Sequence, residues 1–166
     1  LPYDRARTTM AGFGMCARCR REYEDPEDRR FHAQPNACPD CGPQLALWSA
    51  TGAVEATREE GLRRAAEAVR RGEVLAVKGL GGFHLVVAAE DQEAVRRLRA
   101  RKRREEKPLA VLAPSFEWVA ARCEVSPGEA RLLRSPEAPI VLLRRKGDGG
   151  VAPAVAPGNP WLGVML

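Results

Sequence analysis

Apolar residues recur at helical spacing in the segment from Thr57 to Gly72. Thr57 and Glu60 have the spacing of a capping box, with the threonine as N-cap and the glutamate three residues later. A glycine just after the last periodic residue is a stop signal for a helix. The pattern therefore predicts a helix between these two residues, with an apolar stripe made by Leu62, Ala65, Ala66 and Val69.

Further along the chain, short apolar runs alternate with capped helical segments. Asp91 can cap one helix and Ser115 can begin a second, while Ser126 and Glu129 form another capping box with Pro127 at the first helical position. The apolar runs have the length of strands and lie at residues 74–77, 85–88, 108–113 and 140–143. Strands separated by helices predict an α/β sheet that is partly parallel.

The last part of the sequence contains a long loop and then an apolar segment. Residues 146–160 are rich in glycine and proline, and residues 161–166 are apolar and stop without a turn or a polar cap. Since a sheet needs covered faces and edges, we expect the sequence to be a piece cut through a domain of a longer protein. The first residue, Leu1, agrees with that expectation because it is not methionine.

Four of the five cysteines lie in the first 41 residues, in the pattern C-x2-C-x18-C-x2-C. Each C-x2-C can place two thiolates on one tight turn, and two such turns complete a tetrahedron around zinc. Gly42 follows the second pair and permits a positive φ, which would let backbone N–H groups approach the sulfurs. The predicted ligands of a structural Zn²⁺ are Cys16, Cys19, Cys38 and Cys41.

Other uses of these cysteines are less well supported by the sequence. Disulfides require an oxidising compartment, and nothing indicates export, so we expect a cytoplasmic protein. A redox C-x2-C would lie beside a strand–helix unit rather than in a polar segment. His32 could replace a sulfur, but four thiolates already fill the zinc shell. Because the segment between the pairs is too polar to form a core, the metal would supply its folding energy and take no part in catalysis.

Composition and charge narrow the possible functions. The 166 residues are 45% hydrophobic and 30% charged with a mean hydropathy of −0.35, and no apolar stretch is long enough to span a membrane. The net charge is +5, yet the segment from Arg96 to Lys107 alone contains eight basic and two acidic residues. A protein that coats nucleic acid usually carries its excess charge over a whole face. A single basic segment suits a compact anionic ligand at least as well.

A glycine-rich turn and the basic segment form the second set of candidate functional residues. Lys78 precedes glycines at positions 79, 81 and 82, which let a ligand approach backbone N–H groups. This turn alone is weak evidence because it lacks the spacing of a dinucleotide or phosphate-loop motif. The basic segment leaves a helix and enters a strand through Lys107 and Pro108, where open α/β sheets bind ligands. A solvated basic helix face is the alternative interpretation.

Several stretches resemble the HypF family of hydrogenase-maturation carbamoyltransferases. The sequences LPYDR at 1–5, RRFHAQPNACP at 29–39 and CGP at 41–43 are similar to the second zinc finger of that family. The sequence VKGLGGFHL at 77–85, the segment 98–111 and PIVLL at 139–143 resemble its YrdC-like domain. The resemblance covers nearly the whole chain and implies a small four-cysteine zinc-finger module at 1–50, followed by the first part of a YrdC-like twisted α/β sheet domain at 51–166.

The resemblance also implies a reaction. Family members use carbamoyl phosphate and ATP to make carbamoyl adenylate, and pass the carbamoyl group to the C-terminal cysteine of the partner HypE, where it becomes the cyanide ligand of the nickel–iron centre. The family pattern implies that Lys102 and Arg104 hold the triphosphate, that Lys107 assists, and that Lys78 faces the carbamate together with Gly79, Gly81 and Gly82. Lys78, Lys102 and Arg104 are therefore the expected catalytic residues.

Two further expectations follow from the resemblance. Threonylcarbamoyl-adenylate synthases that act on tRNA share the YrdC-like domain, but they carry a threonine-rich turn where this chain has KGLGGFH. The other family domains are absent from these 166 residues, so we expect the chain alone to be catalytically inactive. A zinc-finger module that binds RNA or protein remains the alternative function class, with nucleic acid possible but not favoured.

Overall fold

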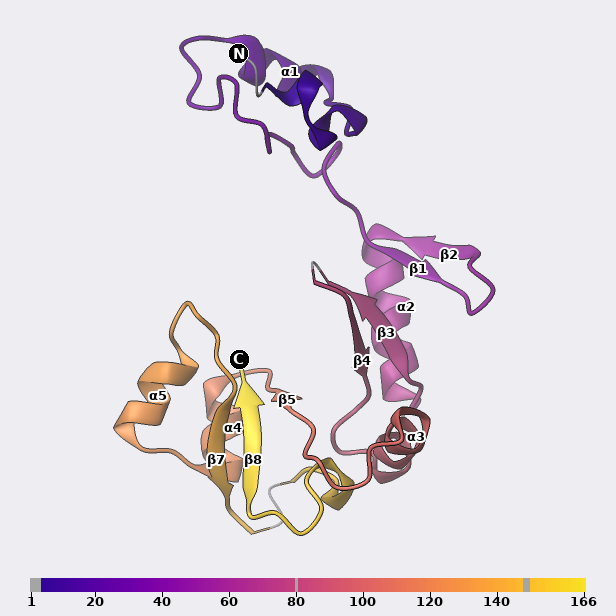
Figure 1. Cartoon of the computed structure of the whole chain (residues 1–166), viewed down its shortest axis with the longest axis vertical. Coiled ribbons are helices and arrows are strands. Elements are labelled where there is room, and N and C mark those ends of the chain that lie inside the picture. The colour runs from indigo at the N-terminus through magenta and orange to yellow at the C-terminus, as the bar shows by residue number, and fades with distance from the viewer. Residues whose placement is uncertain (1–3, 80, 148–149) are drawn as a thin grey trace. The chain divides into compact units, whose positions relative to one another are not determined.

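The computed structural model describes residues 4–79, 81–147 and 150–166, and the chain divides into two compact units, Leu1–Arg64 and Ala65–Leu166 (Figure 1). Among the described residues, no helix combines the length and the apolar character that a bilayer-crossing segment needs.

The first unit consists of short elements around a small and mostly polar interior. Its helical elements are η1 (Arg5–Arg7), η2 (Thr9–Gly12) and α1 (Ala17–Glu24), and its strands β1 (Ala46–Trp48) and β2 (Val54–Thr57) form an antiparallel hairpin. Arg5, Cys19, Tyr23 and Asn36 are buried. So small an interior agrees with the expectation that a metal contributes to the folding of this segment. Helix α1 was not expected from the sequence, because six of its eight residues are charged or tyrosine and carry no apolar periodicity.

Helix α2 (Arg58–Arg70) runs across the boundary between the two units and confirms the helix predicted between Thr57 and Gly72. Gly72 has a φ of +78°, a left-handed conformation that glycine adopts at low cost. The guanidinium of Arg97 donates a hydrogen bond to the carbonyl of Gly72, which fixes this end of α2 to the later part of the second unit.

The second unit contains a four-stranded sheet and a separate hairpin. The sheet has the order β5 (Val111–Leu112), β8 (Trp161–Met165), β7 (Val141–Arg145) and β6 (Cys123–Glu124); β5 and β8 are parallel and the other neighbours antiparallel, which confirms a partly parallel α/β sheet. Strands β3 (Leu75–Lys78) and β4 (Phe83–Val86) form the hairpin. The prediction of a strand at 85–88 was two residues late, because pairing between Lys78 and Phe83 starts β4 immediately after the turn.

The helices of the second unit begin where their caps predict. Asp91 accepts a hydrogen bond from Ala94 at the start of α3 (Gln92–Lys102), and Ser115 accepts one from Trp118 at the start of α4 (Phe116–Arg122). The capping box of Ser126 and Glu129 opens α5 (Pro127–Leu133). All three helices therefore start at a local side-chain signal, which is why a single sequence was enough to find them.

The core of this unit lies on one face of the sheet. Leu143, Leu162 and Val164 are fully buried there, with Val119 of α4 and Leu133 of α5 packed into the same cluster. The opposite face exposes apolar side chains, namely Leu112, Leu142 and Trp161.

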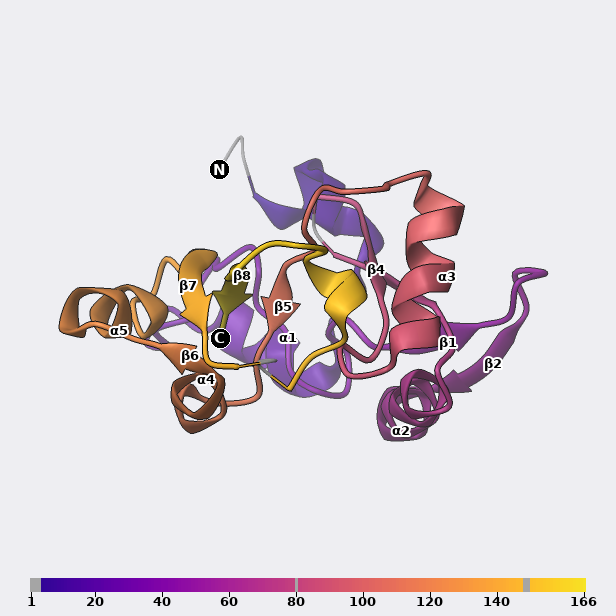
Figure 2. The same ribbon diagram turned by 90° about the horizontal axis from the view of Figure 1, so that it is seen from below.

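The Gly/Pro-rich segment 146–160 contributes to the core more than its composition suggests. It contains η3 (Pro153–Val155), which contacts α3 (Figure 2). The buried residues of this segment are Val151, Ala152, Ala154, Val155 and Ala156. The backbone groups of a buried loop need hydrogen-bond partners. The N–H of Ala152 donates to the carbonyl of Ala89, which lies just before α3, and the N–H of Ala154 donates to the side chain of Gln92, the first residue of α3.

Candidate metal centre and basic loop

The four predicted cysteine ligands converge in the first unit. Their sulfur atoms all lie within 4.8 Å of one another, and the distances from the Cys38 sulfur to those of Cys16 and Cys41 are 3.7 and 3.8 Å. Four sulfurs at about 2.3 Å from a tetrahedral Zn²⁺ would be separated by about 3.8 Å. The sulfur cluster therefore has the dimensions of a four-thiolate zinc site.

The two cysteine pairs reach the cluster from different local structures. Cys16 is the N-cap residue of α1 and Cys19 lies in its first turn, so the first pair sits on a helix N-terminus rather than on the tight turn that we expected. The second pair does lie on a turn, closed by a 2.7 Å hydrogen bond from the Gly42 N–H to the Cys38 carbonyl. Gly42 does not adopt the positive φ that a glycine permits. A glycine is needed there because a Cβ would lie 2.8 Å from the Cys38 carbonyl oxygen.

The pKa values of three thiols in the cluster are shifted in different directions. Backbone N–H groups of Cys16 and Cys38 lower the pKa of Cys41 to about 6, and those of Cys41 and Asp40 also lower the pKa of Cys38. Burial raises the pKa of Cys19 to about 12. Without a cation, the cluster cannot hold four negative charges together at neutral pH, whereas a divalent ion favours the thiolate form of every ligand.

Two buried polar residues hold the backbone that carries the cysteines, and sequence reasoning assigned neither of them a role. The guanidinium of Arg5 donates to the carbonyls of Phe13, Gln34 and Asn36 at 2.7–2.8 Å. These carbonyls lie just before the two cysteine pairs in the sequence. The side-chain amide of Asn36 donates to the Cys19 carbonyl at 2.8 Å. Supporting hydrogen bonds of this kind fix ligand orientation in metal sites.

His32 lies apart from the sulfur cluster. Its Nδ1 is 3.0 Å from a carboxylate oxygen of Asp4, and its imidazole contacts the ring of Tyr23. The interaction with His32 is the main reason why the pKa of Asp4 is lowered. The fifth cysteine, Cys123, is fully buried in the core of the second unit, where burial raises the pKa of its thiol.

The basic loop, residues 102–108, consists of the last residue of α3 and the six residues that follow it. Arg103 ends the helix in the left-handed conformation, with φ 48° and ψ 45°. Lys102 and Lys107 are exposed, whereas Arg104 is half-buried and its guanidinium donates to the carbonyls of Lys107 and Pro108. Two of the N–H groups of Arg104 therefore stabilise the loop by hydrogen bonds to its backbone. The remaining donors, with the two lysines, present positive charge to solvent.

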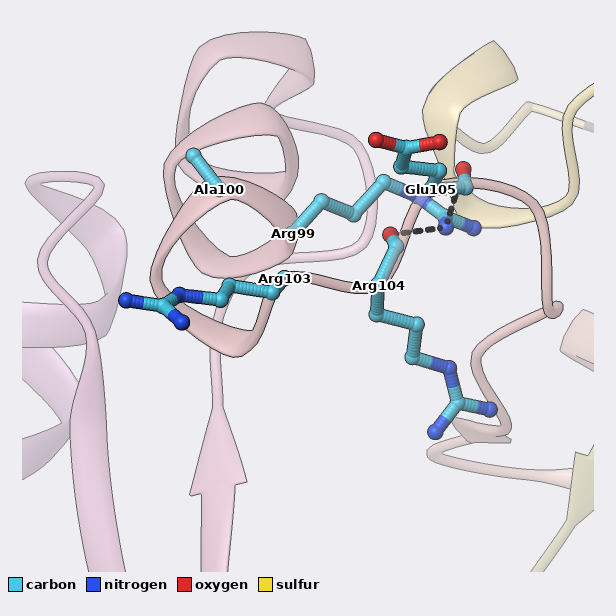
Figure 3. Close-up of a pocket in the computed structure, with 5 residues that line it drawn as sticks. All are labelled: Arg99, Ala100, Arg103, Arg104 and Glu105. Carbon is cyan, nitrogen blue, oxygen red and sulfur yellow. Dashed lines mark hydrogen bonds between the residues drawn. The ribbon is translucent and has the colours of Figure 1, made fainter.

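A depression of about 360 Å³ adjoins this loop and is lined by Arg99, Ala100, Arg103, Arg104 and Glu105. Figure 3 shows the Arg99 guanidinium directed at the backbone of Arg104 and Glu105, while the Arg103 side chain extends in the opposite direction. The depression is open and largely basic, and such a surface can hold phosphate oxygens through charge-assisted hydrogen bonds.

The predicted glycine turn lies at the tip of the β3–β4 hairpin, at the end that points away from α3 (Figure 1). The Gly79 N–H donates to the Gly82 carbonyl at 2.7 Å, and Lys78 lies over the ring of Phe83 at 5.6 Å. Leu80 lies outside the described residues. A Cβ at Gly79 would be 3.2 Å from Nε2 of His84, so this glycine leaves room for the imidazole.

The structure thus brings the four cysteines together and gathers Lys102, Arg104 and Lys107 on one loop. Among the described residues, no hydrogen bond or ion pair joins this loop to Lys78, Gly79, Gly81 or Gly82. The expected carbamate side and the expected phosphate side of the site therefore belong to separate local structures within the second unit.

Comparison with known proteins identifies both parts of the chain. Residues 15–48 match the family described as "HypF finger", and residues 67–166 match the Sua5/YciO/YrdC family, whose description is "Telomere recombination". The carbamoyltransferase HypF of Rhodobacter capsulatus is 55% identical over 166 residues, which are 100% of this chain and 22% of the relative.

Solved structures agree with this assignment. The crystal structure described as that of "T.kodakarensis HypF" has a TM-score of 0.83 at 45% identity, over 100% of this chain and 22% of that one. A full-length HypF "in the phosphate- and nucleotide-bound form" has a TM-score of 0.78 at 47% identity, over 100% of this chain and 21% of that one. The chain spans about a fifth of the length of these relatives. The chain belongs to the Sua5/YciO/YrdC family through residues 67–166, and it is homologous over its whole length to the HypF carbamoyltransferases.

Proposed function

We propose that the chain is the part of a HypF-type carbamoyltransferase that contains a zinc finger, residues 1–50, and the first part of an adenylate-forming YrdC-like domain, residues 51–166. The observation that carries the proposal is the match of the whole chain to a HypF structure in the phosphate- and nucleotide-bound form. In the cytoplasm, where thiols stay reduced, the cysteines would be available to a metal.

The four cysteines would hold Zn²⁺ as a structural ion. Four thiolates fill a tetrahedral shell and leave no position for water or substrate, so the ion would supply folding energy to the finger, on the order of 10 kcal/mol in isolated fingers. The distances between the sulfurs support this role, as does the small polar interior around them.

The reaction would begin with cleavage of carbamoyl phosphate by water, which gives carbamate and inorganic phosphate. A carbamate oxygen would then bond to the α-phosphorus of ATP as pyrophosphate leaves, and the carbamoyl group would pass from the adenylate to the thiol of the C-terminal cysteine of a HypE-type partner, with AMP as the leaving group. Lys102, Arg104 and Lys107 would hold the triphosphate and offset the charge that develops on pyrophosphate. Lys78 and the glycine turn would face the carbamate, a role that rests on the family pattern.

Binding of Mg·ATP to this chain, measured by calorimetry, tests the proposal. The double variant Lys102→Ala/Lys107→Ala removes two exposed charges without removing a loop hydrogen bond donated by a side chain. We expect its affinity to fall at least about tenfold, because a hydrogen bond to a charged group contributes roughly 1.5–3 kcal/mol. The control Arg131→Ala/Arg144→Ala removes the same charge from exposed positions on α5 and β7 and should bind like the wild type.

Two results would contradict the proposal. One is unchanged ATP affinity in the lysine variant. The other is loss of RNA retention, with a steep salt dependence, in a variant whose ATP binding is intact, which would favour a nucleic-acid-binding module. We further expect the 166-residue chain alone to show no ATP–pyrophosphate exchange.

A further inference from the structure

The most unusual side chain of the second unit is Arg99, a buried cation at the end of α3. It is only 8% exposed, and no ion pair among the described residues involves it. A buried charge is normally paired with an opposite charge, because desolvation costs several kcal/mol. Burial and the nearby Arg104 accordingly lower its pKa.

Backbone carbonyls take the place of a carboxylate partner. Nε of Arg99 donates a hydrogen bond to the carbonyl of Ala154. Nη1 donates to the carbonyls of Arg104 and Glu105 at 2.9 and 3.0 Å. Nη2 donates to the carbonyls of Lys107 and Val155 at 3.3 and 3.0 Å. A guanidinium has five N–H donors in a fixed plane, and here all five meet a carbonyl. Lysine has three donors and no planar fork, so it cannot reproduce the set.

The five carbonyls come from two segments. Three belong to the basic loop, and two belong to η3 in the buried segment 151–156. Arg99 therefore turns the loop carbonyls of residues 104, 105 and 107 toward the protein interior. These hydrogen bonds hold the loop backbone at three points, and Lys102 and Lys107 are exposed to solvent.

We propose that Arg99 is a positioning residue that pre-orders the basic loop for the phosphates of a nucleotide. This inference rests on the proposed function, since it takes the loop as the phosphate site. An ordered loop binds its ligand without losing conformational entropy at the moment of binding, which is the general advantage of preorganisation. Arg99 itself need not touch the ligand, because all its donors already have acceptors.

The test compares Arg99→Lys with Arg101→Lys, the same change at an exposed position two residues further along the same helix. Affinities for Mg·ATP, for pyrophosphate and for adenosine are measured below the melting temperature of each variant. We expect Arg99→Lys to lower the affinities for ATP and pyrophosphate about tenfold, equivalent to about 1.4 kcal/mol, and to leave the affinity for adenosine unchanged. Arg101→Lys should bind all three ligands like the wild type. A residue that acts only on stability would lower the melting temperature without this selective loss.

Backbone order parameters from NMR relaxation provide a second measurement. In the wild type without ligand, residues 104–107 should have values near about 0.85, as in rigid backbone, and in Arg99→Lys they should fall below about 0.6. A mobile loop in the wild type overturns the proposal even if no variant folds. Equal ATP affinity in the wild type and Arg99→Lys also overturns it. If the wild-type chain binds neither ATP nor pyrophosphate while its loop is rigid, the proposed function fails and the nucleotide role of Arg99 fails with it.

Discussion

The guanidinium of Arg5 donates a 2.8 Å hydrogen bond to the carbonyl of Asn36, and both residues are at most 5% exposed. Asn36 in turn donates from its side chain to the Cys19 carbonyl. The backbone that leads to the second cysteine pair is thereby tied to a cysteine of the first pair. Like Arg99 in the second unit, Arg5 uses carbonyl acceptors from segments that are distant in sequence to order a functional loop.

Replacement of Asn36 with alanine should loosen the metal site. The change removes the hydrogen bond from the Asn36 side chain to the Cys19 carbonyl, and a typical hydrogen bond contributes about 0.5–1.5 kcal/mol. We expect a matching decrease in zinc affinity, measured by competition with a chromophoric chelator. Asn159→Ala, a change in the second unit, should leave zinc affinity at the wild-type value. Equal zinc affinity in Asn36→Ala and the wild type would show that this hydrogen bond does not support the site.

Substitution of Gly42 tests the close approach at the second cysteine turn. An alanine Cβ would lie 2.8 Å from the Cys38 carbonyl oxygen, a backbone atom that cannot move without moving a ligand. Gly42→Ala should therefore lower the number of zinc ions retained per chain, measured by native mass spectrometry. Gly12→Ala is the matched control, because its Cβ would meet nothing within 4 Å. Full zinc retention by both variants would contradict the geometry of this turn.

The capping box of α5 should make part of the stability pH-dependent. Hydrogen bonds from the side chain and backbone N–H of Ser126 hold the pKa of Glu129 below its usual value of 4.5. A lowered folded-state pKa stabilises the protein above about pH 4.5, and this contribution is lost as the pH falls through the lower, folded-state value. Glu129→Gln keeps a hydrogen-bond acceptor but cannot titrate, so its free energy of unfolding should depend less on pH in that range.

Urea unfolding at a series of pH values between about 3 and 7 would measure this difference, with the exposed Glu124→Gln as control. The difference in the free energy of unfolding between Glu129→Gln and the wild type should be largest near neutral pH and should disappear in acid. A gap that stays constant across the series would mean that the Glu129 carboxylate does not contribute through its charge.

Local signals explain what the sequence predicted well. The caps at Asp91, Ser115 and Ser126 lie within three residues of the N–H groups that they bind, so each helix start can be found without knowledge of the fold. The cysteine spacing is also a local signal, because each C-x2-C brings two sulfurs together and two such pairs have the spacing of a zinc site.

Long-range contacts explain what the sequence did not predict. Arg5 and Arg99 are charged, and charged residues are expected at the surface because most of them are exposed in folded proteins. Their burial depends on carbonyls up to 31 and 56 residues away. The buried residues 151–156 lie within the Gly/Pro-rich stretch 146–160, which the sequence presents as an ordinary loop. Partners for their backbone come from Arg99 and Gln92, which are more than 50 residues away in the sequence. Helix α1 lacks an apolar stripe, since it buries only Cys19 and Tyr23.

The two faces of the sheet should respond differently to the same mutation. Leu143 is fully buried and pairs with Leu162 on the neighbouring strand, whereas Leu142, the residue before it, is 65% exposed on the other face. Leu143→Ala should lower the free energy of unfolding by about 2–5 kcal/mol, because it removes packed methyl groups and leaves a cavity. Leu142→Ala should change it by no more than about 0.5 kcal/mol. Urea unfolding of both variants measures the difference, and an equally large loss in Leu142→Ala would show that its face of the sheet is covered in solution.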